Sequence, residues 1–410
     1  MICNLHARVS LICLRGVFME QKNDKLIALC QSLIRSGTLS GQEEPVAKLL
    51  TDFFMANGFD EVKTDVYGNV IGCIKGKKPG KKLLFDAHMD TVPVSDPSVW
   101  TVDPLGGEIK DGKLYGRGAT DMKGSLAAMM LAAVEFANET GRNFAGEIYI
   151  AGVVHEECFE GVASREISKA VKPDYVVIGE ASDLNLKIGQ RGRAEIVIET
   201  FGKPAHSANP EKGINAVYKM SKVIDAVRTL IPNEHPILGK GILELTDIKS
   251  SPYPGASVVP EYCRCTYDRR LLVGETKESV LAPIKELLYK LMEDDSQLKA
   301  KVSYAVGEET CYTGAKIQGE RFFPGWLFEE SDDFVKDVYA QLKSDGFTPT
   351  ITKYNFCTNA SHYAGEAGIK TLGMGPSNES LAHVVDEYVE LTELEGVLGS
   401  FKSIMKALLK

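Results

Sequence analysis

Residues 82–90 read Lys-Leu-Leu-Phe-Asp-Ala-His-Met-Asp, and this stretch gives the first indication of the fold. Its apolar run is short and continuous, which is typical of a strand that is buried on both faces of a sheet. The run leads into His88 and Asp90, so both polar groups would lie at the carboxyl end of the strand. In open α/β sheets, that end borders the crevice where ligands bind. We therefore predict a sheet whose strand ends carry a functional site.

Ionisable residues recur at the expected ends of further buried strands and at one expected helix start. These segments are Gly116–Gly124 with Asp121, Val154–Gly161 with Glu156 and Glu157, Val176–Glu180, and Ala382–Glu387 with His383. Each one alone has a plainer interpretation, such as a helix cap for Asp121 or a solvated turn for the glutamate pair. However, adjacent carboxylates at the edge of a core repel each other unless a cation is near. Together the segments predict a metal site with His and carboxylate ligands, which favours Zn, Mn or Co.

The order of predicted elements divides the chain into two structural units. Strands alternate with helices over residues 19–190 and 304–410, which predicts an α/β fold with a mixed, mostly parallel sheet flanked by helices. Over residues 191–303 the strands have the alternating pattern of a half-exposed antiparallel sheet, in a βαββαβ order. This block is expected to be an inserted α+β domain. Residues 1–18 do not continue either pattern, and we expect them to be a peripheral N-terminal extension.

Composition excludes several classes of partner. The chain has 410 residues and a formal net charge of −9, without a basic tract, so neither nucleic acid nor an anionic membrane is an expected partner. No apolar run approaches the ~20 residues that span a bilayer. The nine cysteines are scattered and odd in number, which is typical of reduced thiols in a cytoplasmic protein. A small-molecule substrate remains, and it can be an anion if the site is locally cationic.

The spacing and order of the motifs also resemble a known family. The motifs are His88-x-Asp90, Gly-Arg-Gly-x-x-Asp121-Met-Lys-Gly, Glu156-Glu157, Gly-Glu180 and the late His383. They resemble the M20 family of co-catalytic metallohydrolases, which includes acetylornithine deacetylase, succinyl-diaminopimelate desuccinylase, aminoacylases and carboxypeptidase G2-like enzymes. The selenium-metabolism-linked hydrolase branch is the most similar. The resemblance implies a zinc-exopeptidase-like catalytic domain with an inserted ferredoxin-like dimerisation (lid) domain, and hence a homodimer.

The resemblance also implies a role for each residue of the site. Two divalent ions, zinc first and cobalt or manganese as alternatives, would be held by His88 and Glu180 on one side, Glu157 and His383 on the other, and Asp121 between them. Glu156 would be the general base, and Asp90 would orient His88. His206, in Gly202-Lys-Pro-Ala-His-Ser, would reach the active site of the partner subunit and stabilise the oxyanion.

Substrate contacts are the least constrained part of the prediction. The candidates are Arg269, Ser257, Thr358, Asn359 and Gly375. Arg269 could clamp a substrate carboxylate with its forked guanidinium, although a structural salt bridge is the alternative. Ser257 stands where the family usually has asparagine, which leaves the substrate open.

The expected function is hydrolysis of an amide bond in a small carboxylate-bearing substrate, such as an N-acyl amino acid. A metal-dependent dipeptidase or aminopeptidase is the alternative within the same enzyme class. A non-enzymatic metal- or ligand-binding protein is the alternative from another class. Glu156 speaks against the latter, because the metal cage itself does not need a sixth ionisable group.

Overall fold

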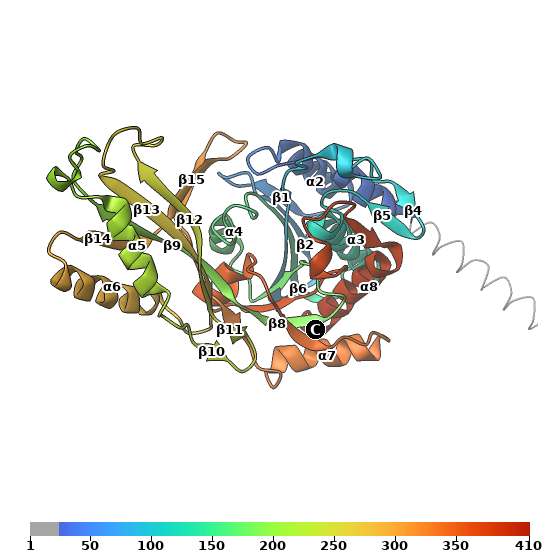
Figure 1. The fold of residues 1–410 in the computed structure, drawn as a ribbon. Coiled ribbons are helices and arrows are strands. Elements are labelled where there is room, and N and C mark those ends of the chain that lie inside the picture. Colours follow the sequence, from blue (N-terminus) through green and yellow to red (C-terminus); the bar gives the residue numbers. More distant parts are fainter. Residues whose placement is uncertain (1–23) are drawn as a thin grey trace, which may run out of the picture.

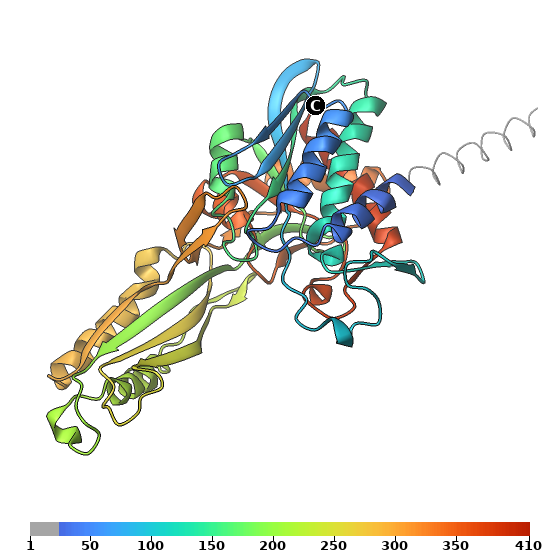
Figure 2. The same cartoon turned by 90° about the horizontal axis from the view of Figure 1, so that it is seen from above.

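The computed structural model describes residues 24–410, so the predicted extension at residues 1–18 lies outside the described residues. The chain builds one large sheet and one smaller sheet (Figure 1). Figure 2 shows the smaller sheet and its helices projecting from the larger one as an arm. Within residues 24–410, no helix is both long enough and apolar enough to cross a membrane.

The large sheet has nine strands and carries the candidate site. Its strands are β1 (Glu61–Thr64), β2 (Val70–Lys75), β3 (Lys78–His88), β6 (Ala145–Val153), β7 (Tyr175–Ile178), β8 (Leu186–Gln190), β18 (Trp326–Leu327), β19 (Ile351–Tyr354) and β20 (Lys370–Gly373). The order across the sheet is β1-β2-β6-β3-β7-β20-β8-β18, with β19 beside β8. The central strands β6, β3, β7 and β20 run parallel, whereas the outer pairs are mainly antiparallel. The predicted fold class, a mixed sheet with a parallel centre, is confirmed.

Helices bury this sheet and explain why its central strands read as continuous apolar runs. A helix over residues 24–35 comes first, followed by α2 (Glu44–Ala56), α3 (Gly124–Glu139), α4 (Ser164–Val171), α7 (Asp333–Ser344) and α8 (Leu391–Leu408). Residues 83–88 of β3 are all buried, without the alternation of a half-exposed strand. Helix α3 is buried on nearly every side and consists mostly of Ala, Leu and Met, which lets α8 pack closely against it.

The small sheet has the βαββαβ order that the sequence predicts. Its elements are β9 (Gly192–Phe201), α5 (Ala216–Val227), β12 (Ile242–Ser251), β13 (Tyr262–Leu271), α6 (Lys277–Asp294) and β14 (Lys299–Tyr304), with β17 (Phe322–Phe323) added beside β9. The strands are antiparallel in the order β12-β13-β9-β14, which is a ferredoxin-like arrangement. Residues of β13 alternate between buried and half-buried, because α5 and α6 cover only one face.

Short strands complete the structure. They are β4 (Ile109–Lys110), β5 (Lys113–Tyr115) and β21 (Tyr388–Glu390) in one sheet, and the hairpins β10 (Glu234–His235) with β11 (Gly239–Lys240) and β15 (Val306–Thr310) with β16 (Lys316–Glu320). Strand β13 begins only at Tyr262. Pro260 precedes it and has no N–H to donate to a ladder, so pairing starts after it.

Candidate active site

Three neighbouring parallel strands deliver ionisable residues to one edge of the large sheet. β3 ends at His88, β6 ends just before the 154–157 turn that carries Glu157, and β7 ends two residues before Glu180. Because these strands are adjacent and parallel, their carboxyl ends meet at the same edge. The sequence-based prediction of one site from separate segments therefore has a direct geometric basis.

Asp121 lies between the two histidines. Its Oδ1 atom is 2.8 Å from Nε2 of His88, and its Oδ2 atom is 3.0 Å from Nε2 of His383. The backbone of Asp121 is not helical (φ −124°, ψ 91°), and α3 begins three residues later, so the side chain does not cap that helix. Each carboxylate oxygen thus faces a different histidine, which is the arrangement required of a ligand shared by two cations.

The ligand atoms form two groups that share Asp121. One group is His88, Asp121 and Glu180, the other is Asp121, Glu157 and His383, and within each group the atoms lie within 4.8 Å of one another. Nε2 of His88 is 3.6 Å from Glu180, and Nε2 of His383 is 3.2 Å from Glu157. Imidazole nitrogens with carboxylate oxygens suit Zn, Mn or Co. The five predicted ligands therefore fit a pair of divalent ions.

The electrostatics of this cluster also favour the binding of cations. Burial raises the pKa of Glu180 and of Glu156 well above the usual range, and neighbouring carboxylates raise both further. The pKa of Asp121 would rise on burial too, but the two histidines hold it well below its usual value. Hydrogen bonds to Asp121 and Glu157 raise the pKa of His383 to about 10. Carboxylates crowded in this way are stabilised by cations.

Asp90 is present in the site, but its carboxylate does not orient His88 as the sequence predicts. Nδ1 of His88 lies 2.8 Å from the backbone oxygen of Asp90 and 3.7 Å from its carboxylate. The carboxylate instead accepts the backbone N–H groups of Glu156 and Glu157 and the hydroxyl of Ser40. The ring of His88 is still oriented through Nδ1, because a backbone carbonyl can serve as the acceptor in place of a carboxylate.

A cavity of about 820 Å³ opens over the candidate metal ligands, between the large and the small sheet. Glu156 also lines it, and within residues 24–410 no hydrogen bond joins its carboxylate to His88 or His383. The other side is cationic and polar. Its lining includes Arg191, Arg193, Ile242 and Arg270 beside the small sheet, and Asn355, Phe356, Cys357, Asn378, Glu379, Ser380 and Ala382 from the large-sheet part of the chain.

The prediction that Arg269 clamps the substrate is wrong in position. Arg269 lies on the buried face of β13, pairs with Glu275 and borders a separate small cavity. Its neighbour Arg270 points to the opposite face and lines the site cavity. Alternation along β13 explains the difference: Cys263, Cys265 and Tyr267 share the buried face with Arg269. Applying that period to the sequence would have selected Arg270.

Three other predicted substrate residues, Thr358, Asn359 and Gly375, do not line the cavity. They instead contact residues that lie next to it. The hydroxyl of Thr358 donates to Gln190, and the Asn359 amide donates to the buried Asp86 and accepts from Gly161. Gly375 packs against the backbone of Glu180, where a Cβ would come within 2.3 Å of a carbonyl oxygen.

His206 and Ser257 lie in paired loops of the small-sheet unit. The backbone of His206 bridges to Val258, and the N–H of Ser207 donates to the carbonyl of Ser257. Both side chains are exposed, and neither lines the cavity of its own chain. In this structure, His206 therefore does not contact the cavity of its own chain.

Glu387 was not among the predicted residues, but it supports the shared ligand. Its Oε1 atom accepts the backbone N–H groups of Gly118, Thr120 and Asp121, and Oε2 pairs with Arg117 at 2.6 Å. It follows His383 by four residues, so it ties the His383 loop to the Asp121 loop. Its position beside a candidate ligand was the only signal in the sequence.

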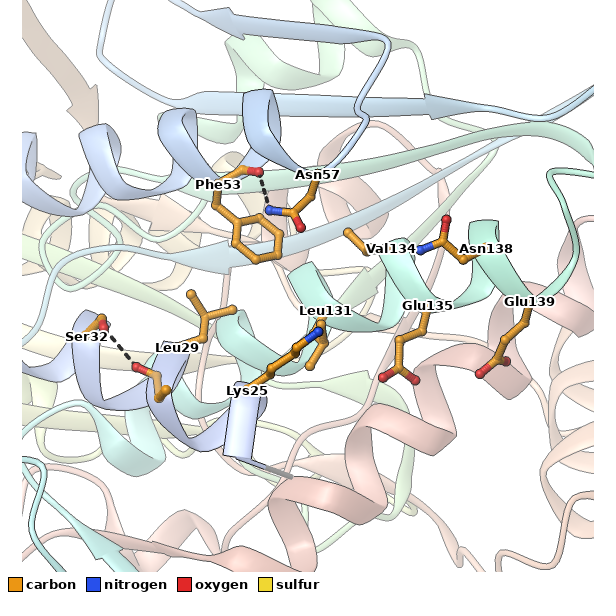
Figure 3. A pocket seen from close by; sticks show the side chains of 11 residues that line it. Lys25, Leu29, Ser32, Phe53, Asn57, Leu131, Val134, Glu135, Asn138 and Glu139 are labelled. Carbon is orange, nitrogen blue, oxygen red and sulfur yellow. Dashed lines mark hydrogen bonds between the residues drawn. The ribbon is translucent and has the colours of Figure 1, made fainter. Parts of the chain in front are cut away.

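A second hollow of about 620 Å³ lies among the helices of the large-sheet unit (Figure 3). Lys25, Leu29 and Ser32 line it from the first helix, Phe53 from α2, and Leu131 from α3. None of the groups of potential metal ligands found within residues 24–410 lies there. Within residues 24–410, the two groups of potential metal ligands lie at the cavity between the two sheets instead.

Comparison with known proteins agrees with this geometry. Residues 84–407 match the model of peptidase family M20/M25/M40. The uncharacterised protein YgeY of Escherichia coli K12 is 33% identical over 335 residues, covering 80% of this chain and 81% of YgeY. Succinyl-diaminopimelate desuccinylase 2 of Ruegeria sp. TM1040 is 28% identical, covering 93% and 94%.

Among solved structures, the Bacillus subtilis YXEP protein, a dinuclear metal-binding peptidase, superimposes with a TM-score of 0.71 at 13% identity. The alignment covers 95% of this chain and 99% of that one, which shows a common fold. The family match spans most of the chain and includes all five candidate ligands, Glu156 and the whole small sheet, and it begins within β3 of the large sheet. The chain therefore belongs to the M20/M25/M40 peptidase family, and it is a metal-dependent hydrolase of amide C–N bonds.

Proposed function

We propose that the protein is a co-catalytic dinuclear amidohydrolase that removes the acyl group from an N-acyl amino acid or a related small carboxylate. The observation that carries this proposal is Asp121, with one oxygen toward each histidine, beside a cavity lined by both Glu156 and Arg270. Zinc is the proposed metal, because the donors are histidine and carboxylate without cysteine. Cobalt and manganese accept the same donors.

The chain supplies a base next to the metal ligands. When bound, the two ions would polarise the amide carbonyl and acidify water at the site. Glu156 is proposed to take the proton of the attacking water and to pass it to the leaving nitrogen. Burial and neighbouring carboxylates raise the pKa of Glu156, and bound cations would lower it, so that the carboxylate can accept the proton.

Arginines in the cavity support a substrate with a carboxylate. Arg193 is already neutralised by Glu160, Glu195 and Asp268. Arg270 shares Asp268 with Arg193, so part of its charge is available. Arg191 donates only to backbone carbonyls and has no carboxylate partner among residues 24–410. A guanidinium with free donors binds a carboxylate in a bidentate geometry.

A homodimer is part of the proposal. His206 is exposed and lies away from its own cavity, so it would complete the site of a partner subunit, as in the predicted lid over residues 191–303. The outer strand β12 pairs only with β13 among the described strands and exposes Ile242 and Ile248. An edge of this kind is suited to association with a second copy. A cytoplasmic location is proposed from the scattered, odd-numbered cysteines.

A dipeptidase or aminopeptidase is a second candidate, and Glu160 favours it. Glu160 lines the cavity, and its Oε2 atom is buried without a hydrogen-bond partner within the described chain. A carboxylate oxygen in that position could accept a free α-ammonium group, which N-acyl amino acids lack.

The two candidates are separated by a substrate screen on the metal-reconstituted enzyme. Matched substrates would be N-acetyl and N-succinyl amino acids, the corresponding dipeptides and ureido acids. If the protein is a deacylase, it should hydrolyse the N-acetyl and N-succinyl amino acids. A free α-amino group on the substrate should then change the rate of hydrolysis little. Turnover restricted to substrates with a free α-amino group would contradict it and support the peptidase.

A further inference from the structure

The turn that carries Glu156 and Glu157 begins where β6 leaves the sheet, so its N–H groups have no strand partners. Side chains accept all four of them instead. The acceptors are Asn69 for Val154 (2.9 Å), Oε1 of Glu43 for His155 (3.1 Å), and the carboxylate of Asp90 for Glu156 (3.2 Å) and Glu157 (3.3 Å). Buried backbone donors require such partners, so the shape of the turn depends on where these acceptors lie.

His155 is the point at which the turn changes direction. Its φ is +56°, in the left-handed region that non-glycine residues rarely adopt. Both glutamates line the cavity, but Glu157 lies 3.2 Å from Nε2 of His383, whereas no hydrogen bond within residues 24–410 joins Glu156 to either histidine. Such a backbone conformation persists only where its surroundings fix it. The acceptor of the His155 N–H is therefore in a position to determine the direction of Glu156.

That acceptor, Glu43, is fully buried just before α2 and does not line the site cavity. Its Oε1 atom also accepts the N–H of Gly41 at 2.9 Å. Its Oε2 atom has no hydrogen-bond partner in the part of the chain described. Burying a carboxylate with one unpartnered oxygen is unfavourable. The need of the turn for a hydrogen-bond acceptor at this position would offset that cost.

The segment that carries Glu43 is joined to the strand end that carries His88. The carbonyl of Thr38 accepts the N–H of Thr91 at 3.0 Å, and the hydroxyl of Ser40 donates to Asp90 at 2.7 Å. Glu43 and Asp90 therefore belong to one connected unit. The carboxylates of Glu43 and Asp90 accept N–H groups of the turn, so this unit fixes the position of the turn relative to His88.

We propose that Glu43 is a positioning residue for hydrolysis, whose Oε1 atom fixes the backbone of His155 and so aims Glu156 at the substrate. This inference rests on the proposed role of Glu156 as the base. It requires an acceptor of the right length at position 43 and does not require a negative charge. Burial, followed by the nearby charge of Asp90, raises the pKa of Glu43 to about 7, which agrees with a group whose charge is dispensable.

Length and charge are separated by three variants of the metal-loaded enzyme. Glu43→Gln keeps an acceptor oxygen at the same reach and removes the charge. Glu43→Asp keeps the charge but is shorter by one methylene, and Glu43→Ala removes the acceptor. The neighbouring exposed Glu44→Ala serves as the matched control. For each protein, kcat, KM and bound metal are measured together.

We expect Glu43→Gln to retain kcat within about threefold, and Glu43→Asp and Glu43→Ala to lose it by on the order of 10²-fold, because small misplacements of a reacting group have effects of that size. KM and metal content should change little. The inference is overturned if Glu43→Asp keeps wild-type kcat, if Glu43→Gln is as slow as Glu43→Asp, or if lost activity tracks lost metal. Should Glu43→Ala fail to fold, the Gln and Asp variants still decide the question.

A Glu156→Gln arm distinguishes failure of this inference from failure of the proposed function. If Glu156→Gln is inactive while every Glu43 variant is normal, only the role of Glu43 is wrong. If Glu156→Gln is fully active, the assignment of the base is wrong, and the inference falls with it.

Discussion

Nε2 of His383 lies 3.0 Å from Oδ2 of Asp121, which joins the last predicted ligand of the chain to the central one. The other oxygen of Asp121 faces His88. The two groups of candidate ligands are therefore distinct but share a single carboxylate. Removing a shared ligand and removing a terminal ligand should have different consequences.

Asp121→Ala should abolish binding of both ions, because both groups of ligands contain that carboxylate. His383→Ala should lose one ion and keep the one near His88 and Glu180. Metal content after dialysis, measured by atomic emission, checks both expectations. Equal metal loss in the two variants would contradict separate sites with one shared ligand.

Arg270→Ala and Arg269→Ala form a matched pair on β13. Arg270 lines the cavity, so its loss should raise KM for a carboxylate substrate by roughly 10- to 100-fold, as for a lost charged hydrogen bond. Arg269 is buried and pairs with the half-buried Glu275, so its loss should lower the melting temperature with little change in KM. Steady-state kinetics and thermal unfolding separate the two effects. The reverse pattern would restore Arg269 as the clamp.

Hybrid dimers test the proposed contribution of His206 across subunits. His206→Ala and Glu156→Gln homodimers should each be inactive. Mixing and reassociation should restore about a quarter of wild-type activity, because random pairing gives half hybrids with one intact site each. Activity that stays absent after subunit exchange has been verified would argue against a histidine supplied by the partner.

Glu43→Gln should also change how stability depends on pH. The pKa of Glu43 is raised on folding from 4.5 to about 7 by burial and by Asp90. As pH rises from 4.5 to 7, the unfolded chain releases this proton before the folded chain does, so the free energy of unfolding falls. Glutamine does not titrate, so the variant has no such decrease. The free energy of unfolding of the variant minus that of wild type should therefore rise by on the order of 1–3 kcal/mol over this interval and remain constant at higher pH.

Urea unfolding of the metal-free proteins between pH 4.5 and pH 8 measures this difference. An exposed Glu44→Gln variant, which should show no such trend, controls for the change in net charge. A constant difference between wild type and Glu43→Gln across the interval would show that Glu43 does not hold its proton on folding.

The fold, and the convergence of the candidate ligands at one edge of the sheet, were predictable because both depend on local patterns. Short apolar runs predicted buried parallel strands, and the residue types that follow them predicted what meets at the sheet edge. His88, Glu157 and Glu180 came from adjacent strand ends, which is why separate motifs converged on one site. Family resemblance supplied the pairing of ligands, which spacing alone could not give.

The substrate side was not predictable to the same extent, because it depends on which face of a strand or loop a residue occupies. Arg269 and Arg270 are consecutive residues of β13, so their side chains lie on opposite faces of the sheet. The prediction selected the residue on the wrong face. Thr358 and Asn359 were sensible polar candidates, but their partners, Gln190 and Asp86, lie far away in sequence. Glu43 had no visible signal, since its partner is a backbone N–H that any residue at position 155 would present.

The central claim is that Glu156 acts as the base beside a metal pair that does not need it as a ligand. The most direct measurement is kcat of Glu156→Gln together with its bound metal, against a substrate that the wild-type enzyme hydrolyses. We expect two ions to be retained and kcat to fall by roughly 10²- to 10⁴-fold, the usual contribution of general acid–base catalysis. Undiminished turnover with both ions bound would contradict the assignment.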